Sequence, residues 1–550
     1  MKPQPTPRWD RDTTLVSQIA AGASLLAFLF YFRRGDLLLY GDAVAHINIA
    51  RRVFDSQTPG LLQLGTVWLP LPHLLMIPFL LSGSAWQTGI GGSVPSVCAY
   101  VLGAVGVFRL VRGALRSCSA AEPAARMVAW LAAAVYAGNP NLVYLQTTAM
   151  TEPLYLALFT WAVVHFSEFV QALSGASSNT RVARSSLMKC GVCVAGACLT
   201  RYDGWLLAGV IGLAALVLVL RSQASRQTLG PDLGKLVLLL GAAPALWLGY
   251  NALIYRNPLE FANGPYSAKA IEQKSATAGQ SGHPGSNNLT VAFSYFLKSA
   301  ELNMATGVWG RLWVTLLVAG TLIVLAGEPR LWPLLILWIP LAFYVLSVAE
   351  GGVPIFLPVW WPFSYYNARY GIEMLPAFAV LTAVTTHFVL SRMPNRCARI
   401  AAGLAPVLLL VASYGFIWRQ QPVCYREAWV NSRTQIALET ELAATLIRLP
   451  HDSTLLMYLG DHVGALQRAA IPLRRTINEG NHRPWKKPTD PEGLWERALA
   501  DPRSYADYVV AMEGDPVASG ALKRDLSSIA VIRATGQPTA TVYWTHRPPR

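Results

Sequence analysis

The segment LGTVWLPLPHLLMIPFLLS, residues 64–82, decides how often the chain crosses a membrane. It is apolar, but Pro70, Pro72 and Pro78 interrupt it. Proline lacks the backbone N–H donor and breaks the interior of a helix, so the uninterrupted apolar stretch is short. A spanning helix needs about 20 apolar residues, whereas stretches of about 10–14 residues are more often interfacial or re-entrant. We therefore predict that residues 64–82 do not cross the membrane.

The rest of the chain carries longer apolar runs. Of its 550 residues, 53% are hydrophobic and 14% are charged, whereas an ordinary soluble domain has about 25% charged residues. A run of roughly 18 or more apolar residues is a transmembrane helix candidate. The runs lie at about 15–32, 94–115, 127–149, 153–171, 187–200, 204–220, 235–255, 308–327, 331–349, 371–391 and 400–418.

Basic loops set the orientation of these eleven predicted spans. If residues 64–82 stay outside the bilayer, all the strong basic clusters between spans fall on the side of the N-terminus, as the positive-inside rule requires. The N-terminus is then cytoplasmic and the C-terminus extracytoplasmic. Arg33, Arg34, Arg51 and Arg52 lie on the opposite side, where phosphate binding or contact with lipid headgroups would explain them. The clusters lie at 109–126, 181–189, 221–235 and 392–399.

We predict a mainly α fold, a polytopic transmembrane helical bundle with a small C-terminal α/β domain. Residues 1–14 form the cytoplasmic N-terminus and residues 15–418 the transmembrane domain. Outer loops are expected at 33–93, with juxtamembrane helices, and at 256–307. Residues 419–550 form the extracytoplasmic domain, in a plasma or inner membrane if the source is bacterial.

The C-terminal segment alternates between helical and strand-like patterns. Residues 432–449 have helical periodicity, and strand-like runs follow at 454–459, 508–512, 529–533 and 540–544. It contains no glycine-rich phosphate loop. We interpret it as an accessory or acceptor-side domain.

The net charge of +15 does not indicate nucleic-acid binding. Such binding leaves a clustered basic face, whereas the basic residues here are spread over short loops between apolar runs. The seven cysteines form no disulfide framework or strong metal cluster. Nucleic acid is therefore excluded as a partner, and membrane lipids are expected.

The first outer loop carries an acid and two histidines. Asp42 follows Gly41 at the end of the first span and suits a helix start. His46 lies four residues later, on the same helix face as a possible partner of Asp42. His73 lies among prolines and apolar residues, where it suits a ligand contact. A helix start, an interfacial helix and a structural histidine are the alternative interpretations.

Four more charged residues lie at span ends on the same predicted face. Glu152 stands between two spans, Arg201 and Asp203 interrupt one apolar stretch, and Arg369 with Tyr370 precedes a late span. Helix starts and a local ion pair would explain each alone. An acid near hydrocarbon is nevertheless a functional candidate by default, and arginine suits phosphate. Together they fit a lipid-phosphate substrate, with a carboxylate as general base on an acceptor hydroxyl.

The order of these motifs resembles the GT-C membrane glycosyltransferases, nearest to the protein O-mannosyltransferase and aminoarabinose-transferase branch. The resemblance covers about residues 15–418. The motif Gly41-Asp42-Ala43 has a single acid, where the mannosyltransferase branch has an adjacent Asp-Glu pair. The matching motifs are Gly41-Asp42, WLPLPH at 68–73, TEPL at 151–154, TRYDGW at 200–205, and Arg369-Tyr370 before Pro376.

The resemblance implies a polyprenyl-phosphate sugar donor, such as dolichyl- or undecaprenyl-phosphate mannose, and a protein, lipid or glycan acceptor. It implies that Asp42 is the catalytic acid, as base or acceptor-orienting group, and that Glu152 supports acceptor or site geometry. Arg201 and Arg369 would contact the donor phosphate. We group Asp203, Tyr370, His73 and His46 with the substrate-binding residues.

Two other function classes remain open from the sequence. A transporter or flippase of a lipid-linked or anionic substrate would place polar residues near the middle of its spans, whereas the charges here gather at one face. A lipid-linked sugar ligase or polymerase is the other enzyme class. No cofactor is certain, although Asp42, His46 and Glu152 could hold a divalent metal ion if they converge.

Overall fold

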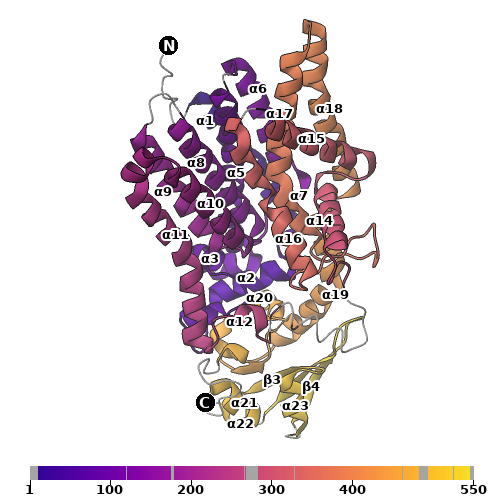
Figure 1. The fold of residues 1–550 in the computed structure, drawn as a ribbon. Helices are drawn as coiled ribbons and strands as arrows, with labels where there is room; N and C mark the ends of the chain where they lie inside the picture. The colour runs from indigo at the N-terminus through magenta and orange to yellow at the C-terminus, as the bar shows by residue number, and fades with distance from the viewer. Residues whose placement is uncertain are drawn as a thin grey trace.

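The computed structural model describes residues 10–118, 120–174, 179–265, 267, 270, 283–327, 329–460, 462–481, 493–523 and 526–545. A body of long helices fills most of the molecule, and a small domain with a β-sheet lies at one end (Figure 1). The fold class predicted from the sequence is confirmed.

Within the described residues, nine helices are long and apolar enough to cross a membrane. Two more predicted runs fall on α6 (Glu122–Ala137), which has 16 residues, and on α9 (Thr180–Cys198), which carries three basic residues. The nine are α1 (Arg11–Arg34), α5 (Ile90–Ser117), α8 (Glu152–Ser174), α10 (Asp203–Leu220), α11 (Gln223–Tyr255), α15 (Gly307–Ala326), η3 (Pro329–Trp338) with α16 (Ile339–Ala349), η4 (Ala368–Met374) with α17 (Leu375–Arg392), and α18 (Arg396–Gln420).

Residues 64–82 form no spanning helix. They include the end of η2 (Leu61–Leu64) and the ten-residue helix α3 (Leu71–Leu80). Ten residues extend about 15 Å, half of a hydrocarbon core of about 30 Å. Pro70 and Pro72 stand at the start of α3, where a missing N–H donor has little effect. The segment is thus a short helix beside the bundle, as its prolines predict.

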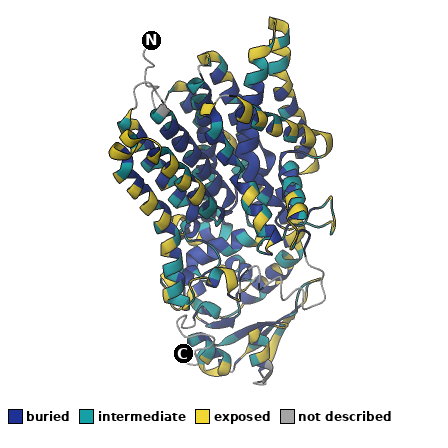
Figure 2. Cartoon of the chain, in the orientation of Figure 1, coloured by how far each residue is buried: buried dark blue, intermediate teal, exposed yellow. Residues whose placement is uncertain are grey.

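The outer faces of the peripheral helices are apolar. Leu246 on α11 is 68% exposed, and Leu408 and Val411 on α18 are 64% and 67% exposed. Figure 2 shows exposed residues along these outer faces and buried residues along the inner ones. Such surfaces are rare on soluble monomers and suit contact with lipid. The chain is an integral, multi-pass membrane protein.

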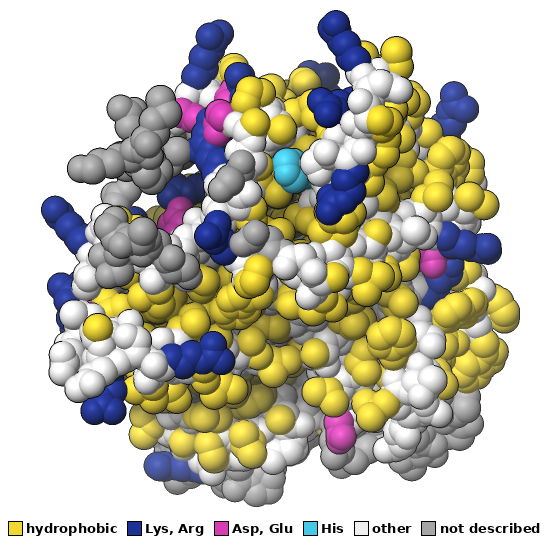
Figure 3. Space-filling view, turned by 45° about the horizontal axis from the view of Figure 1, so that its top comes forward, with side chains coloured by type: hydrophobic (Ala, Val, Ile, Leu, Met, Phe, Trp, Pro, Cys, Tyr) yellow, Lys and Arg dark blue, Asp and Glu magenta, His cyan; other side chains and the backbone are white. Residues whose placement is uncertain are grey.

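The N-terminal end of the bundle is rich in basic side chains. The N-terminus lies at one end and the C-terminal domain at the other (Figure 1). Seen toward the N-terminal end, many Lys and Arg side chains surround an apolar body, and Asp and Glu side chains are fewer (Figure 3). This arrangement agrees with the predicted cytoplasmic loops, while the orientation in a membrane stays a prediction.

The C-terminal domain is a mixed sheet with short helices. Its strand order is β2-β1-β3-β5-β4, and β1 pairs in parallel with β2 and β3 while β5 pairs antiparallel with β3 and β4. Four strands lie where the sequence predicts them, and the two-residue β2 was not predicted. The strands are β1 (Leu455–Met457), β2 (Thr476–Ile477), β3 (Tyr508–Met512), β4 (Ser527–Ile532) and β5 (Ala540–Trp544).

The remaining elements are short or lie between the spans. Helix α19 (Val423–Leu446) begins nine residues before the helix predicted at 432–449 and ends near its predicted end. The others are η1 (Asp36–Leu38), α2 (Gly41–Arg52), α4 (Gly83–Thr88), α7 (Pro140–Leu145), α12 (Glu260–Asn263), α14 (Leu289–Met304), α20 (Gly464–Arg468), η5 (Leu473–Arg475), η6 (Glu479–Asn481), α21 (Leu494–Ala500), α22 (Pro502–Tyr505) and α23 (Pro516–Lys523).

A buried ring of hydrogen bonds joins the C-terminal domain to the first outer loop. Asn48 on α2 donates to Oε1 of Gln467 on α20 at 2.8 Å, and Gln467 donates to the carbonyl of Trp86 at 2.7 Å. The indole of Trp86 closes the ring by donating to Oδ1 of Asn48 at 3.0 Å. Because all three groups are buried and satisfied, they fix the domain against α2.

Candidate functional site

Arg369 joins three helices at the centre of the site. Its Nε donates to Oε1 of Glu152 at 3.1 Å, and its Nη1 donates to Oε1 of Glu427 at 3.0 Å. Its Nη2 donates to Oδ2 of Asp42. Asp42 lies on α2, Glu152 begins α8 and Glu427 lies on α19. One planar guanidinium thus uses its fork of donors to connect three segments far apart in the sequence.

Arg201 forms a second centre in the turn between α9 and α10. Its Nη1 donates to the Thr151 hydroxyl at 3.0 Å and its Nη2 donates to the Tyr344 hydroxyl at 2.5 Å. Three carboxylates lie close to its nitrogens: Glu152 at 3.3 Å, Glu373 at 3.4 Å and Asp203 at 3.8 Å. Glu152 therefore bridges the two arginines.

Tyr370 lies against both cations. The ring centroid is 4.9 Å from the guanidinium carbon of Arg201 and 4.8 Å from that of Arg369. A cation over an aromatic face is attracted by the ring quadrupole. Gly371 follows, where any side chain would clash with the backbone of Ser299 on α14. Glycine thus lets η4 pack directly against α14 and sets the position of Arg369 and Tyr370.

Local structure favours the acids at these positions. Glu152 and Asp203 are the first residues of α8 and α10, and Asp42 lies in the first turn of α2. The unpaired N–H groups at a helix N-terminus favour negative charge. Pro153 in the first turn of α8 needs no N–H partner there. The sequence therefore builds three acidic helix starts, and the tertiary fold brings them together.

The side chains differ sharply in exposure. Those of Glu152 and Glu373 are 0% exposed, and those of Asp203 and Glu427 are 1% exposed. The side chain of Asp42 is 39% exposed. Asp42 is thus the one acid of this cluster that a ligand can reach, while the other four face the two arginines from inside the protein.

The cluster holds more acid than base. Five carboxyl groups surround two guanidinium groups. Among the described residues, both carboxylate oxygens of Asp203 and Glu373 and the Oε2 atoms of Glu152 and Glu427 have no hydrogen-bond partner. The side chains of Arg369 and Arg201 are 7% and 13% exposed. Both guanidiniums are therefore already compensated by acids of the protein.

His46 and His73 form a buried pair beside this cluster. Nδ1 of His46 and Nε2 of His73 share a hydrogen bond of 2.9 Å, and the two residues are 2% and 0% exposed. Burial, together with the charges of Arg369 and Arg201, lowers the pKa of His46 to about 3. Burial lowers the pKa of His73 well below its ordinary value, and Arg52 contributes to this shift. Both rings are neutral in the folded protein at pH 7.

This pair predicts that acid destabilises the protein. In the unfolded chain each histidine takes up a proton near pH 6.5, whereas His46 in the folded chain does so only near pH 3. The unfolded state therefore binds more protons below pH 6.5, and the free energy of unfolding falls as the pH falls. The slope approaches about 1.4 kcal/mol per pH unit for each histidine.

The check is thermal unfolding of the detergent-solubilised protein between pH 7.5 and pH 5. We expect a smaller loss of melting temperature in His73→Asn than in the parent protein. His451 is exposed, so His451→Asn serves as the matched control and should behave like the parent. An equal loss in all three proteins would contradict the prediction.

The structure brings together six of the eight predicted site residues. Asp42, Glu152, Arg201, Asp203 and Arg369 are connected by ion pairs, and Tyr370 lies between the arginines. His46 and His73 lie beside them. The sequence predicted Asp42 as the partner of His46. In the structure His46 shares a hydrogen bond with His73, because α3 packs against α2.

The possible divalent ion site of Asp42, His46 and Glu152 does not form. Asp42 and Glu152 both bind Arg369, and His46 binds His73. In the part of the chain that the structure describes, no three His, Cys, Asp or Glu side chains form a group that could hold a metal ion.

Glu427 and Glu373 also belong to the site, although the sequence did not predict them there. Glu427 belongs to the segment that we interpreted as an accessory domain, yet it binds Arg369 from the start of α19. The available signal was an acid just after the last span, the same signal that selected Glu152. Glu373 follows Arg369 by four residues, one helical turn, and faces Arg201.

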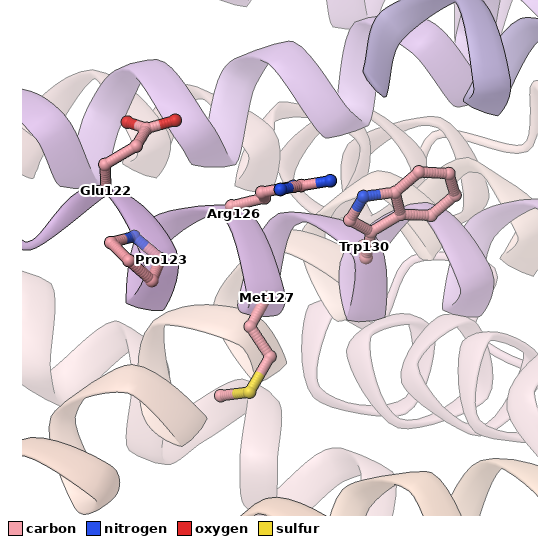
Figure 4. Close-up of a pocket in the computed structure, with 5 residues that line it drawn as sticks. All are labelled: Glu122, Pro123, Arg126, Met127 and Trp130. Atoms are coloured by element: carbon pink, nitrogen blue, oxygen red, sulfur yellow. The ribbon is translucent and has the colours of Figure 1, made fainter. Parts of the chain in front are cut away.

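An open pocket lies elsewhere, near the start of α6. Its five lining residues, Glu122, Pro123, Arg126, Met127 and Trp130, come from one helix (Figure 4). Helix α6 begins near the N-terminal end of the bundle, away from α2 (Figure 1). This pocket is a groove between side chains of a single helix, and it contains no part of the carboxylate–arginine cluster.

Comparison with known proteins identifies the fold. No family model matches the sequence, and no curated protein matches it. The crystal structure of ArnT from Cupriavidus metallidurans bound to undecaprenyl phosphate aligns with a TM-score of 0.54 and 15% identity, over 97% of this chain and 99% of that one. The apo structure of the same enzyme gives 0.53 and 13% identity, over 96% and 100%.

The apo oligosaccharyltransferase from Archaeoglobus fulgidus aligns with a TM-score of 0.48 and 13% identity, over 91% of this chain and 69% of that one. ArnT is an aminoarabinose transferase of the GT-C class. Its alignment covers nearly all of both chains, so the resemblance in fold includes the C-terminal domain. The chain therefore has the fold of the GT-C membrane glycosyltransferases.

Proposed function

We propose that this protein is a membrane glycosyltransferase that moves a sugar from a polyprenyl-phosphate donor to an acceptor hydroxyl on the extracytoplasmic side. Two observations support the proposal: the GT-C fold, and an acid–arginine cluster at the end of the bundle that carries the C-terminal domain. The structure of ArnT with undecaprenyl phosphate supports a lipid phosphate as the leaving group.

The observation that carries the proposal is the exposure of Asp42. It is the one acid of the cluster open to a ligand, and Arg369 holds its carboxylate in a fixed direction. A general base must lie within hydrogen-bond reach of the proton that it removes. A carboxylate that is both oriented and accessible meets this requirement.

The proposed reaction is a single displacement at the anomeric carbon of the donor. The acceptor hydroxyl gives its proton to the Asp42 carboxylate, and its oxygen forms a bond to the anomeric carbon. The bond between that carbon and the phosphate oxygen breaks, and the electron pair leaves with the polyprenyl phosphate. Binding the donor and the acceptor in the correct relative orientation, at a site partly shielded from water, supplies much of the rate enhancement.

The buried residues position this base. Glu152 bridges Arg369 and Arg201, and we propose it as a positioning residue for Asp42 through Arg369. Asp203 and Tyr370 act on Arg201 in the same way. The resemblance predicts that Arg201 and Arg369 contact the donor phosphate, whereas in this structure both guanidiniums are paired with carboxylates.

The test is transfer by the purified full chain in detergent. Radiolabelled polyprenyl-phosphate mannose is the first donor, offered with membrane extract as the source of acceptor, followed by donors with other hexoses and pentoses. We expect label in a product that is no longer bound to the polyprenyl phosphate. No covalent product with any lipid-phosphate sugar would contradict the proposal.

The same preparation separates an enzyme from a transporter or flippase. In liposomes, a flippase moves a lipid-linked sugar between leaflets without breaking the sugar–phosphate bond. Movement without a covalent product would favour this alternative, whereas transfer in detergent, where no leaflets exist, would exclude it as the explanation.

A further inference from the structure

Arg52, the last residue of α2, is a cation without a hydrogen-bond or ion-pair partner among the described residues. Its Nε is buried and has no hydrogen-bond partner, and the residue makes no hydrogen bond or ion pair with any residue that the structure describes. The residue is half-buried, and a buried N–H donor without a partner is unfavourable unless a ligand compensates it. The guanidinium of Arg52 is therefore suited to bind an anion.

Two other arginines of residues 33–52 do have partners. Nε of Arg51 donates to Asp55 at 2.8 Å, and its guanidinium carbon lies 5.1 Å from the ring centroid of Trp86. Arg34 donates to Asp36 at 2.7 Å and to the hydroxyl of Tyr425 at 2.9 Å. These two arginines are structural, whereas Arg52 has no structural role of that kind.

Polar atoms without partners lie near the guanidinium. A Cβ atom at Gly480 would come within 3.7 Å of Nη1 of Arg52 and 2.8 Å of Oε1 of Gln63, so glycine keeps this space free. Nδ1 of His73 is fully buried and has no partner, and Arg52 contributes to the depressed pKa of this histidine. Oε1 of Gln63 also has no partner.

The alternative phosphate ligands, Arg201 and Arg369, lie in an environment that repels anions. Five carboxyl groups surround them, and few of their atoms are exposed. A phosphate there would face excess negative charge at low dielectric, where repulsion is strong. It would also have to displace carboxylates that make direct hydrogen bonds.

The distance between Asp42 and Arg52 fits a sugar phosphate. Ten residues of helix separate their Cα atoms by about 15 Å. The long arginine side chain spans part of this distance. A sugar unit and its acceptor fit in the remainder. We infer that Arg52 binds the phosphate of the donor, in place of Arg201 and Arg369, while Asp42 acts on the acceptor hydroxyl at the opposite face of the anomeric carbon.

The inference rests on the proposed function, and ligand binding tests it without turnover. The full chain in detergent is titrated with undecaprenyl phosphate and, separately, with undecaprenol, which lacks the phosphate. The parent protein should prefer the phosphate at least tenfold. Arg52→Gln should lose about ten- to hundredfold in affinity for undecaprenyl phosphate and none for undecaprenol. Arg52→Lys should retain part of the preference.

Arg33→Gln is the matched control, because Arg33 is an exposed arginine at the end of α1 and should not affect the preference. The Arg201→Gln variant should keep the preference for undecaprenyl phosphate over undecaprenol, even if the variant is less stable than the parent. Parental preference in a folded Arg52→Gln variant would overturn the inference, as would loss of the preference in Arg201→Gln alone.

A parent protein without any preference for the phosphate would overturn the proposed function itself. A competition experiment identifies the source of the phosphate. Phosphatidylglycerol that displaces undecaprenyl phosphate at equal concentration would show a general headgroup site and would overturn the assignment to the donor.

Discussion

Asp42→Asn is expected to lower the rate of sugar transfer by about 10²- to 10⁴-fold, because the amide cannot accept the proton of the acceptor hydroxyl. Arg369 keeps its hydrogen bonds to Glu152 and Glu427 in this variant, so the site should stay assembled. The measurement is the initial rate of transfer from a polyprenyl-phosphate sugar at saturating donor. The loss should appear in kcat.

The controls for Asp42→Asn separate chemistry from folding. Glu441 on α19 is an exposed acid far from Arg369 in sequence, so Glu441→Gln should keep the parental rate. The affinity of Asp42→Asn for undecaprenyl phosphate should match that of the parent, because Asp42 does not hold the phosphate. Transfer at the parental rate by Asp42→Asn would eliminate Asp42 as the base.

Arg369→Met is expected to destabilise the protein by about 3–5 kcal/mol and to abolish transfer. Removing one partner of a buried ion pair leaves uncompensated charge, and here Glu152 and Glu427 would both remain buried. The variant also frees Asp42 from its orienting contact. The measurement is the melting temperature in detergent together with the rate of transfer.

Two further variants make this result interpretable. Arg369→Lys retains the charge, but one ammonium cannot bind three carboxylates on three helices in the same way, so an intermediate loss is expected. Arg392 is exposed at the opposite end of α17, and Arg392→Met should change stability by less than about 0.5 kcal/mol. A parental melting temperature for Arg369→Met would show that the cluster does not hold these helices together.

Local sequence patterns predicted much of the fold. The apolar runs identified the spans because a helix in lipid must satisfy its own backbone and present an apolar surface. Three prolines predicted that residues 64–82 would not span, and only the ten-residue α3 forms there. Alternating patterns located four of the five strands of the C-terminal domain, whereas a two-residue strand such as β2 leaves no periodic signal.

Local patterns also selected part of the site. Asp42, Glu152, Arg201, Asp203 and Arg369 were chosen because charge at a span end is costly without a function. The partners of these residues were not predictable in the same way. His46 was expected to face Asp42, its neighbour on the helix, but α3 packs beside α2 and supplies His73 instead.

The sequence by itself determined the membrane character of the protein, the approximate positions of its spans and the acids and arginines at their ends. These properties depend on the composition of short segments. Only the tertiary structure decided that Arg369 binds Asp42, 327 positions earlier in the chain, and that Glu427 completes the cluster. It also decided that the buried Nε of Arg52 has no hydrogen-bond partner among the described residues. Such pairings depend on how distant helices pack, and the periodicity of a single segment does not record them.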